Sequence, residues 1–507
     1  MTDGALNQFL GTEPAVGNIS FASLLGTQTI SLRELHRRAG RVARWLLNRG
    51  VRPGDRIGIL GANSLDWVLL DLAALRLKVE TAGFEPGKFS PTNELADRYG
   101  VTLMFTDQPT HSPRNIPMSD VTVHSRRKDL EGAPLPPARW EPKDVTSIKF
   151  TSGSTGEPKG LGATAGSVDS SLSAVQEIFE HGPGDNLFVF LPLSLLQQRY
   201  WIYSALLHGH DVTVSTHEAA FFAMPRVRPT VVMGVPAFYE AARRQIETRM
   251  RRAGGSQTPH QIAGTVFGNR IRYLWTGSAP AAPSTLSFFT TAGLPIYEGY
   301  GLNEACIVTK NHPKAHRAGS VGQALSGKDV LIGEDGVISV RSEHPVNDHY
   351  AYAKAGDSEK VFGPDGTVRT GDVGYLDEDG FLFIRGRADD VIVLDNGKKV
   401  VVRPVEDRMK SDPAIAECVL FCPGQTELVA VVSPASVPAD LEAIASCLAR
   451  TNTALSADEH ISRVVVADPP FSIENGLLTS QYKPRRQNIL DAYYQAVHNP
   501  KEGIDVS

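Results

Sequence analysis

The residues from Thr151 to Gly160 have the composition of a phosphate-binding loop. They read Thr-Ser-Gly-Ser-Thr-Gly-Glu-Pro-Lys-Gly and directly follow the apolar run that ends at Phe150. Hydroxyl groups and backbone amides donate hydrogen bonds to phosphate oxygens, glycines allow close approach of the backbone, and Lys159 adds positive charge. The Walker P-loop is a different pattern, because it requires a glycine where this chain has Pro158. Composition alone leaves two interpretations open, a triphosphate site and a flexible surface loop.

Further motifs rich in charged and small residues follow this loop. They occupy residues 297–304 (Tyr-Glu-Gly-Tyr-Gly-Leu-Asn-Glu), 369–372 (Arg-Thr-Gly-Asp), 386–390 (Gly-Arg-Ala-Asp-Asp) and 475–486. In this order the motifs resemble those of the adenylate-forming superfamily, which includes acyl-CoA synthetases, the adenylation domains of peptide synthetases and luciferase. The chain is most similar to the long-chain type of acyl-CoA synthetase. The resemblance implies an enzyme that uses ATP and Mg²⁺ to join an oxyacid to AMP.

The resemblance also implies which residues contact the nucleotide. Asn303 stands where the family has a threonine that contacts a phosphate, and an amide can donate the same bond. Asp372 offers two acceptor oxygens to the ribose hydroxyls, Arg387 adds a ribose or phosphate contact, and the adenine stacks near Gly277. The nucleotide-binding residues expected on this basis are Thr151, Ser152, Gly153, Ser154, Thr155, Gly156, Gly277, Ser278, Ala279, Glu298, Gly299, Tyr300, Gly301, Asn303, Asp372, Ile384 and Arg387.

Lys159, Glu304 and Lys483 are the residues expected to take part in catalysis. Glu304 is the expected Mg²⁺ ligand, since a hard cation held between phosphates takes one or two carboxylates. Lys483 matches the family lysine that bridges the acid and the α-phosphate, where a point charge stabilises oxygens that gain charge. The ordinary alternatives are a surface glutamate and a solvated basic cluster. Because Lys483 lies so far along the chain, the resemblance implies a lid domain that rotates about a hinge at Asp389.

The segments expected to bind the acid depart from the long-chain pattern. Leu195 replaces the histidine that lines the acid pocket of those relatives, and Gln198 precedes an arginine where a glutamate is usual. Tyr200 and Trp201 crowd the place where an aliphatic tunnel would begin, and aromatic walls suit a short or planar acid. Gly234 lies in a second segment that borders the tunnel in those relatives. These five residues form the predicted substrate pocket.

The leading hypothesis is that a small or aromatic oxyacid, in the first instance a carboxylate, is activated as its AMP anhydride and passed to CoA. A carrier thiol or an amine is another acceptor to consider. An alternative keeps ATP and changes the acid, since some relatives activate nitrous acid and pass it to an aryl amine to form a diazo group. A third interpretation is a nucleotide-binding module without catalysis, which the intact Lys159, Glu304, Asp372 and Lys483 disfavour.

The predicted elements indicate how these motifs are positioned. Residues 31–47 have a capping-box start and an amphipathic pattern, residues 56–60 form a strand, and residues 64–77 form a second helix. Strands that alternate with helices favour a parallel sheet under helical cover. We predict an α/β fold in which residues 1–385 form a large layered domain with a small β-barrel-like part. Residues 386–507 form a small, mobile α+β lid.

The composition of the 507 residues excludes several classes of partner. The net charge of −5, from 51 basic and 56 acidic residues, gives no electrostatic reason to bind nucleic acid or an anionic membrane. The first residues lack a secretory pattern, and the apolar run 187–196 is too short to span a bilayer. Four scattered cysteines do not make a disulfide framework, so core packing is expected for Cys418 and Cys422. We expect a cytoplasmic enzyme without a membrane span.

Overall fold

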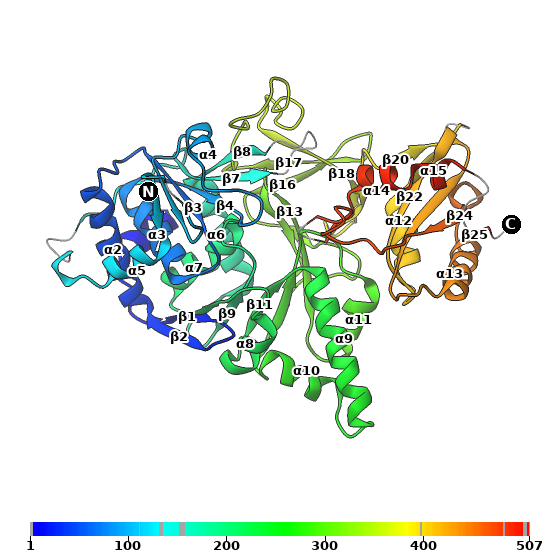
Figure 1. Ribbon diagram of the computed structural model, residues 1–507, viewed down its shortest axis with the longest axis horizontal. Coiled ribbons are helices and arrows are strands. Elements are labelled where there is room, and N and C mark those ends of the chain that lie inside the picture. The colour runs from blue at the N-terminus through cyan, green and yellow to red at the C-terminus, as the bar shows by residue number, and fades with distance from the viewer. Residues whose placement is uncertain are drawn as a thin grey trace.

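The structure is a computed structural model that describes residues 4–110, 112–130, 135–151, 158–395, 398–479, 482–499 and 504–505. A large amino-terminal part is followed along the long axis by a smaller carboxy-terminal part (Figure 1). The predicted α/β class, with one large and one small part, is confirmed.

Two mixed sheets form the large part. The six-stranded sheet has the order β6 (Asn115–Pro117), β5 (Leu103–Thr106), β3 (Arg56–Leu60), β4 (Glu80–Phe84), β7 (Val145–Thr151) and β8 (Lys159–Thr164). The nine-stranded sheet has the order β15 (Gln323–Ala324), β14 (Cys306–Lys310), β13 (Ile296–Leu302), β12 (Tyr273–Thr276), β11 (Val231–Gly234), β9 (Asn186–Val189), β10 (Asp211–Val214), β1 (Asn18–Ala22) and β2 (Thr27–Ser31). The inner pairings are parallel, as predicted, and β2, β8, β14 and β15 pair antiparallel.

Helices alternate with these strands. In the large part they are α1 (Ala5–Gly11), α2 (Leu32–Asn48), α3 (Leu65–Leu77), α4 (Asn93–Arg98), α5 (Met118–Ser125), α6 (Ala165–Phe179), α7 (Leu196–His208), α8 (Ala220–Val227), α9 (Pro236–Ala253), α10 (Pro259–Phe267) and α11 (Pro283–Thr291). Ser31 and Ser64 cap α2 and α3, and their hydroxyls accept hydrogen bonds from backbone amides at 3.1 and 3.2 Å. The predicted helices and the strand between them are therefore confirmed.

Alternate residues of β9 show how helices cover the nine-stranded sheet. Leu187 and Val189 belong to a core cluster shared with α1, α6 and α7, whereas Phe188 belongs to a second cluster shared with α8 to α11. Successive side chains of a strand point to opposite faces. Both faces of this sheet are therefore buried under helices, and binding groups must be presented at the strand ends.

An antiparallel sheet of β16 (Lys328–Ile332), β17 (Val337–Ser342), β18 (Thr367–Leu376) and β19 (Leu382–Arg387) links the two parts. Its described strands form an open sheet with β16 and β19 at its edges. An acidic turn joins β18 to β19, and the Asp377 amide donates a hydrogen bond across it to the Phe381 carbonyl at 3.0 Å.

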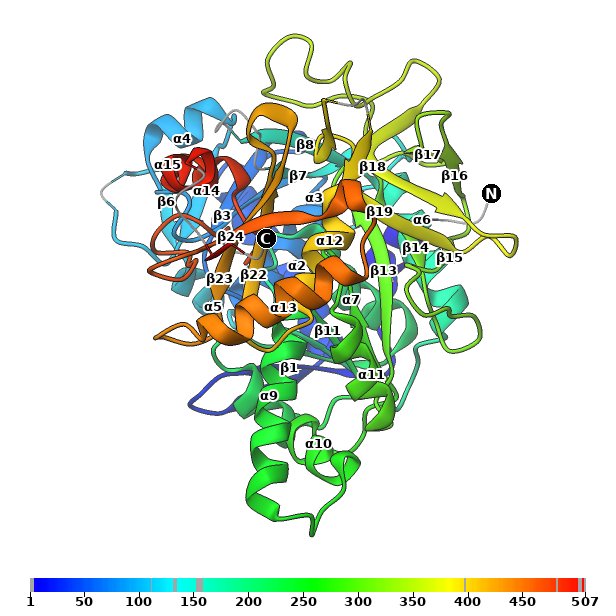
Figure 2. The same cartoon turned by 90° about the vertical axis from the view of Figure 1, so that its right-hand side faces the viewer.

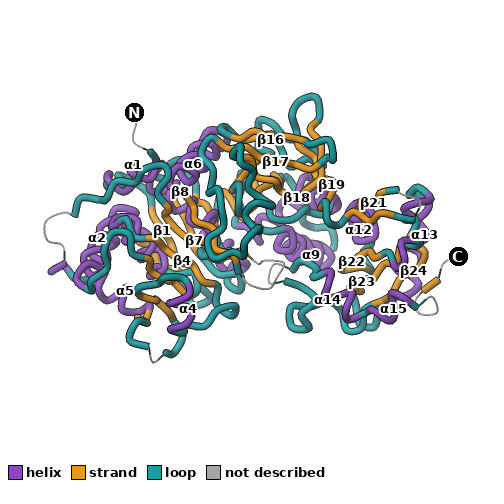
Figure 3. The backbone as a smooth tube through the Cα atoms, turned by 90° about the horizontal axis from the view of Figure 1, so that it is seen from above, coloured by secondary structure: helices purple, strands orange, loops and turns teal. Residues whose placement is uncertain are grey.

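The carboxy-terminal part has cores of its own (Figure 2, Figure 3). Its elements are β20 (Val391–Val393), β21 (Lys399–Val401), α12 (Val402–Lys410), β22 (Ile415–Phe421), β23 (Leu428–Pro434), α13 (Leu441–Thr453), β24 (Ile461–Val466), α14 (Arg486–Ala492), α15 (Tyr494–His498) and β25 (Ile504–Asp505). Cys418 is buried in one of these cores, as expected from its apolar surroundings. Among the helices that the structure describes, none has the length and apolar character needed to cross a bilayer.

Candidate active site

The carboxyl ends of β11 and β12 lie beside the middle of β13 in the nine-stranded sheet. Gly234 is paired with Thr276, and Thr276 with Glu298, so that Gly277 and Gly299 follow side by side. A Cβ atom at Gly277 would lie 3.3 Å from the Gly299 carbonyl oxygen, so a side chain there would crowd the neighbouring strand. Ligands of parallel sheets bind at the carboxyl ends of the strands.

A cavity of about 70 Å³ lies at these strand ends. It brings both groups of predicted residues together. From the nucleotide group its wall contains Gly277, Ser278, Gly299, Tyr300 and Gly301, and from the substrate-pocket group it contains Gln198, Trp201 and Gly234. Sequence reasoning missed the other wall residues, which are Leu191, Gln197, Met233, Val235, Trp275 and Ile307.

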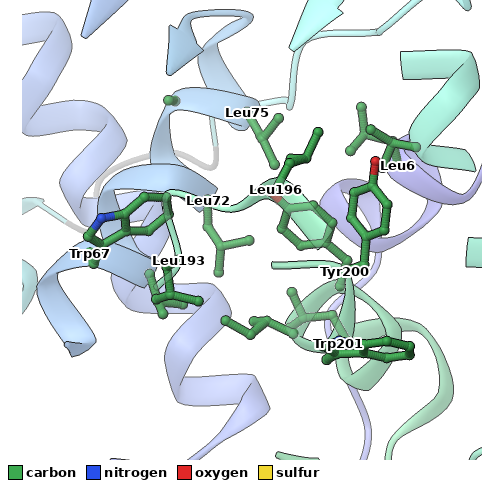
Figure 4. Close-up of a cluster of buried hydrophobic side chains, with 14 of the residues drawn as sticks. Leu6, Trp67, Leu72, Leu75, Leu193, Leu196, Tyr200 and Trp201 are labelled. Carbon is green, nitrogen blue, oxygen red and sulfur yellow. The ribbon is translucent and has the colours of Figure 1, made fainter. Parts of the chain in front are cut away.

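Two residues of the predicted substrate pocket, Leu195 and Tyr200, lie outside this wall. Leu195 precedes the first turn of α7. Tyr200 lies among the buried hydrophobic side chains of Figure 4, and its hydroxyl is 3.8 Å from Cys306 Sγ. The reason is the phase of the helix: at about 3.6 residues per turn, Gln198 and Trp201 share a face that excludes Tyr200.

Asp372, the residue expected to bind the ribose, accepts hydrogen bonds through both carboxylate oxygens. The Tyr300 hydroxyl donates to Oδ2 at 2.6 Å, and Arg387 Nη1 donates to Oδ1 at 3.2 Å. The arginine comes from β19, where it is directly paired with Asp372 on β18. Burial and the neighbouring Asp372 carboxylate raise the pKa of Tyr300 well above its ordinary value, so the phenol remains a donor.

Glu304, the expected Mg²⁺ ligand, accepts a hydrogen bond from the Tyr350 hydroxyl at 2.6 Å through Oε1. Tyr350 belongs to the connection between β17 and β18. Burial, and then the charge of Glu304, raise the pKa of this phenol above its ordinary value. Sequence reasoning missed Tyr350, because no spacing rule links residues 46 positions apart across different elements.

A buried cation supports the loop that carries Glu304. The Lys149 ammonium, with only 5% of the residue exposed, donates a hydrogen bond to the carbonyl of Asn303 at 2.8 Å. Burial lowers the pKa of Lys149, and the nearby Cys306 and Glu304 oppose that effect. The carbonyl of Asn303 is therefore fixed by β7, the strand that leads into the predicted phosphate loop.

Lys159 is held by the connection that also carries Tyr350. Its Nζ atom lies 3.0 Å from Asp357 Oδ2 and 5.2 Å from the ring centroid of Tyr350. The hydrogen bond with Lys159 lowers the pKa of Asp357. The predicted phosphate-loop residues Ser152, Gly153, Ser154, Thr155 and Gly156 lie outside the described residues, as does the side chain of Thr151.

Lys483 reaches the large part from the carboxy-terminal part. Its Nζ atom donates a hydrogen bond to the carbonyl of Ser278 at 2.5 Å, and Ser278 lines the cavity. Burial lowers the pKa of Lys483, and the charge of Asp372 opposes this. The structure therefore brings together Lys483, Ser278 and Asp372, which are far apart in the sequence.

The segment that carries Lys483 is tied to the predicted hinge by an arginine that sequence reasoning did not single out. Arg486 Nε donates to Asp390 Oδ1 at 3.0 Å, and its Nη atoms donate to Glu406 Oε1 at 2.6 and 2.7 Å. Asp389, the expected hinge residue, accepts a hydrogen bond from Arg387 Nε at 3.1 Å.

The remaining predicted nucleotide residues, Ala279, Glu298, Asn303 and Ile384, are not part of the cavity wall. Glu298 accepts a hydrogen bond from the Ala281 amide at 3.1 Å, and burial raises its pKa. Ala279 follows Ser278, Asn303 is exposed, and Ile384 packs partly buried against the core of the β16–β19 sheet.

The fold and this site define the class of protein as an adenylate-forming enzyme. The chain belongs to the AMP-binding enzyme family: that family's model matches residues 13–340, and a model for the AMP-binding enzyme C-terminal domain matches residues 389–499. The family membership expected from the ordered motifs is confirmed, and the chain is an ATP-dependent adenylate-forming ligase.

The known proteins to which the chain is similar include CoA ligases. A long-chain-fatty-acid–CoA ligase of Mycobacterium bovis is 25% identical over 543 aligned positions, which cover 90% of this chain and 90% of the relative. The solved structure of o-succinylbenzoate CoA synthetase from Bacillus subtilis, in complex with AMP, matches 99% of both chains with a TM-score of 0.77 and 19% identity. An anthranilate CoA ligase in complex with anthranoyl-AMP matches 98% of both chains with a TM-score of 0.77 and 18% identity.

Proposed function

We propose that this ligase activates a carboxylic acid about the size of a single ring and transfers the acyl group to CoA. In the first step a carboxylate oxygen bonds to the α-phosphorus of ATP, the bond to the β-phosphate breaks, and pyrophosphate leaves. In the second step the thiolate sulfur bonds to the acyl carbon and AMP leaves. The observation that carries the proposal is the hydrogen bond from Lys483 to the carbonyl of Ser278, because Ser278 lines the same cavity as Gly299 and Gln198.

The residues at the nucleotide end fit a ribose and its phosphates. Asp372 presents an acceptor pair whose orientation is fixed by Tyr300 and Arg387, which suits a diol. Two lysines supply positive charge: Lys159, which precedes Asp372 in the sequence, and Lys483, which follows it. A cation fixed at the site of bond formation stabilises oxygens that gain charge in the transition state.

The chemistry of Glu304 fits Mg²⁺ held mainly by phosphates and water. Among the described residues, no group of three or more histidine, cysteine, aspartate or glutamate side chains could hold a metal ion by itself. Mg²⁺ bound with a nucleotide takes only one or two protein carboxylates and keeps several waters. When bound, the ion would supply positive charge that stabilises the negative charge of the pyrophosphate as it leaves.

The size of the cavity supports a compact acid. Its volume of about 70 Å³ corresponds to roughly five waters, on the scale at which one water needs ~10–15 Å³. Trp201 and Trp275 close the acid end with ring centroids 4.9 Å apart in an edge-to-face arrangement. The two similar solved structures are an o-succinylbenzoate CoA synthetase and an anthranilate CoA ligase, both named for aromatic acids, whereas the bacterial relative is a long-chain-fatty-acid–CoA ligase.

The proposed function includes a mobile lid. We place the domain boundary between residues 385 and 386 and the hinge at Asp389, which accepts a hydrogen bond from Arg387 and is followed by Asp390, the partner of Arg486. The present position brings Lys483 to the cavity for the adenylation step. Rotation about the hinge would remove Lys483 and open the site to CoA.

The test is acid-dependent exchange of pyrophosphate into ATP, followed by CoA consumption. A panel of short, single-ring and long-chain carboxylates is offered with Mg²⁺ and ATP, and a separate arm offers nitrite with an aminoaryl acid and no CoA. We expect exchange with a single-ring or short acid and formation of its CoA thioester. AMP release that requires nitrite and an aryl amine would contradict the proposal and favour the diazo-forming alternative.

A further inference from the structure

The acid end of the cavity contains one amide whose acceptor has no partner. Gln198 lines the cavity and is 8% exposed. Its Oε1 atom is buried and accepts no hydrogen bond from any residue that the structure describes. A buried amide oxygen without a partner is unfavourable, and native proteins satisfy nearly all such groups. A ligand is the partner that the cavity can admit.

Two other polar side chains of the wall, Tyr300 and Gln197, are already engaged. The Tyr300 hydroxyl donates to Asp372, and Gln197 Nε2 lies 3.9 Å from Cys306 Sγ, to which it is directed. On the same helix, Arg199 donates to Asp71 at 2.8 Å, which directs that guanidinium into the core. Gln198 Oε1 is the buried acceptor of this wall that has no partner among the described residues.

The surroundings of Gln198 would make a hydrogen bond from a ligand to its Oε1 atom selective. The wall next to it is formed by Trp201, Met233 and Val235, which are apolar apart from the indole nitrogen. Water that could replace a missing ligand group has little room in a cavity of about 70 Å³ once an acid is bound. A site that buries an acceptor in this way rejects an analogue that lacks the matching donor.

We propose that Gln198 is a specificity-determining residue, and that the acid carries an N–H or O–H donor directed at the Gln198 amide. The substrate class is thus an amino- or hydroxy-substituted carboxylic acid, with a single ring or a chain of similar size. This inference rests on the proposed function, because it places an acid in the cavity beside Lys483.

The experiment compares matched acids in the full-length protein. Benzoates that carry an amino, hydroxy or methyl group at the ortho, meta or para position are assayed by pyrophosphate exchange with Mg²⁺ and ATP. At one position we expect kcat/KM for the amino or hydroxy acid to exceed that of the methyl acid by about 100-fold or more. Equal values for the three substituents at every position would overturn the inference while leaving acid activation intact.

The variant Gln198→Met keeps the size of the side chain and removes the amide. It should lower the amino-to-methyl preference at least tenfold, mainly by raising kcat/KM for the methyl acid. The control Gln28→Met makes the same chemical change at an exposed position on β2 and should keep the preference. A preference that survives in Gln198→Met overturns the inference. Failure of every acid with the unmodified protein would instead refute the proposed function itself.

Discussion

The charged residues proposed to bind the nucleotide and the wall proposed to bind the acid are built differently. Asp372, Glu304 and Lys159 come from strands and their connections, lie outside the cavity wall, and each have a protein partner. The proposed acid wall consists of a helix face and apolar side chains, and it leaves the Gln198 acceptor unpaired. Under the proposed function, the common chemistry is held by preorganised polar contacts, whereas selectivity depends on shape and one hydrogen bond.

The largest effect is expected from Lys483→Ala, which removes the cation delivered to the nucleotide end. Adenylation should fall about 10²–10³-fold, because a fixed donor in the transition state is lost. Transfer to CoA from preformed acyl-AMP should change far less. Pyrophosphate exchange and single-turnover thioester formation measure the two steps separately. Arg485→Ala is the control, and equal loss of both steps in Lys483→Ala would argue for a structural role instead.

The variant Trp201→Ala tests whether the acid end sets the size of the substrate. Removal of this buried side chain should lower the free energy of unfolding by about 3–5 kcal/mol. It should also shift kcat/KM toward acids with bulkier substituents, while KM for ATP changes little. Chemical denaturation and an acid panel measure the two effects. An unchanged size preference would mean that Trp201 does not limit the pocket.

The stability of the carboxy-terminal part should depend on pH through Glu406, which binds Arg486. Burial raises the pKa of Glu406 from 4.5 to about 7, so the folded chain holds a proton that the unfolded chain releases in this range. Protonated Glu406 therefore stabilises the folded chain fully below pH 4.5. As the pH rises to 7 this stabilisation is lost, and the free energy of unfolding falls by about 3 kcal/mol. Chemical denaturation at several pH values should show that Glu406→Gln lacks this pH dependence of the free energy of unfolding. The control Glu442→Gln, at an exposed position, should keep it.

The smallest effect is expected from Tyr350→Phe, which removes the hydrogen bond to Glu304 at the nucleotide end. The loss of one bond to a charged group should lower kcat/KM for Mg²⁺-ATP about tenfold. Tyr352→Phe is the control, because Tyr352 belongs to the same connection and contacts Arg56 instead. Similar losses in both variants would indicate a general disturbance of the connection.

The sequence predicted the elements and the groups at the nucleotide end better than the acid end. The helix starts at Ser31 and Ser64 follow from local capping. The ordered motifs assign Lys483 and Ser278 to one nucleotide site, and the contact between the two residues is seen only in the structure. The position of Tyr200 could not be predicted, because sequence gives the period of a helix but not which face meets a cavity.

Partners that come from distant connections were also missed. Lys149 looks like part of an apolar strand, and only the packing of β7 against the loop at Asn303 reveals its contact. Tyr350 and Asp357 lie in a stretch without a regular pattern, so no periodicity marks them. Tertiary contacts of this kind are decided by how elements pack, which local patterns do not encode.

The connection between β17 and β18 holds a cation and a carboxylate at once, through Asp357 on Lys159 and Tyr350 on Glu304. A shift of that one segment would loosen both contacts together. Occupation of either group by a ligand would then make the other easier to occupy, which is thermodynamic linkage between the two positions. Under the proposed roles of Lys159 and Glu304, nucleotide and divalent ion would therefore bind cooperatively, each increasing the affinity for the other by the same factor.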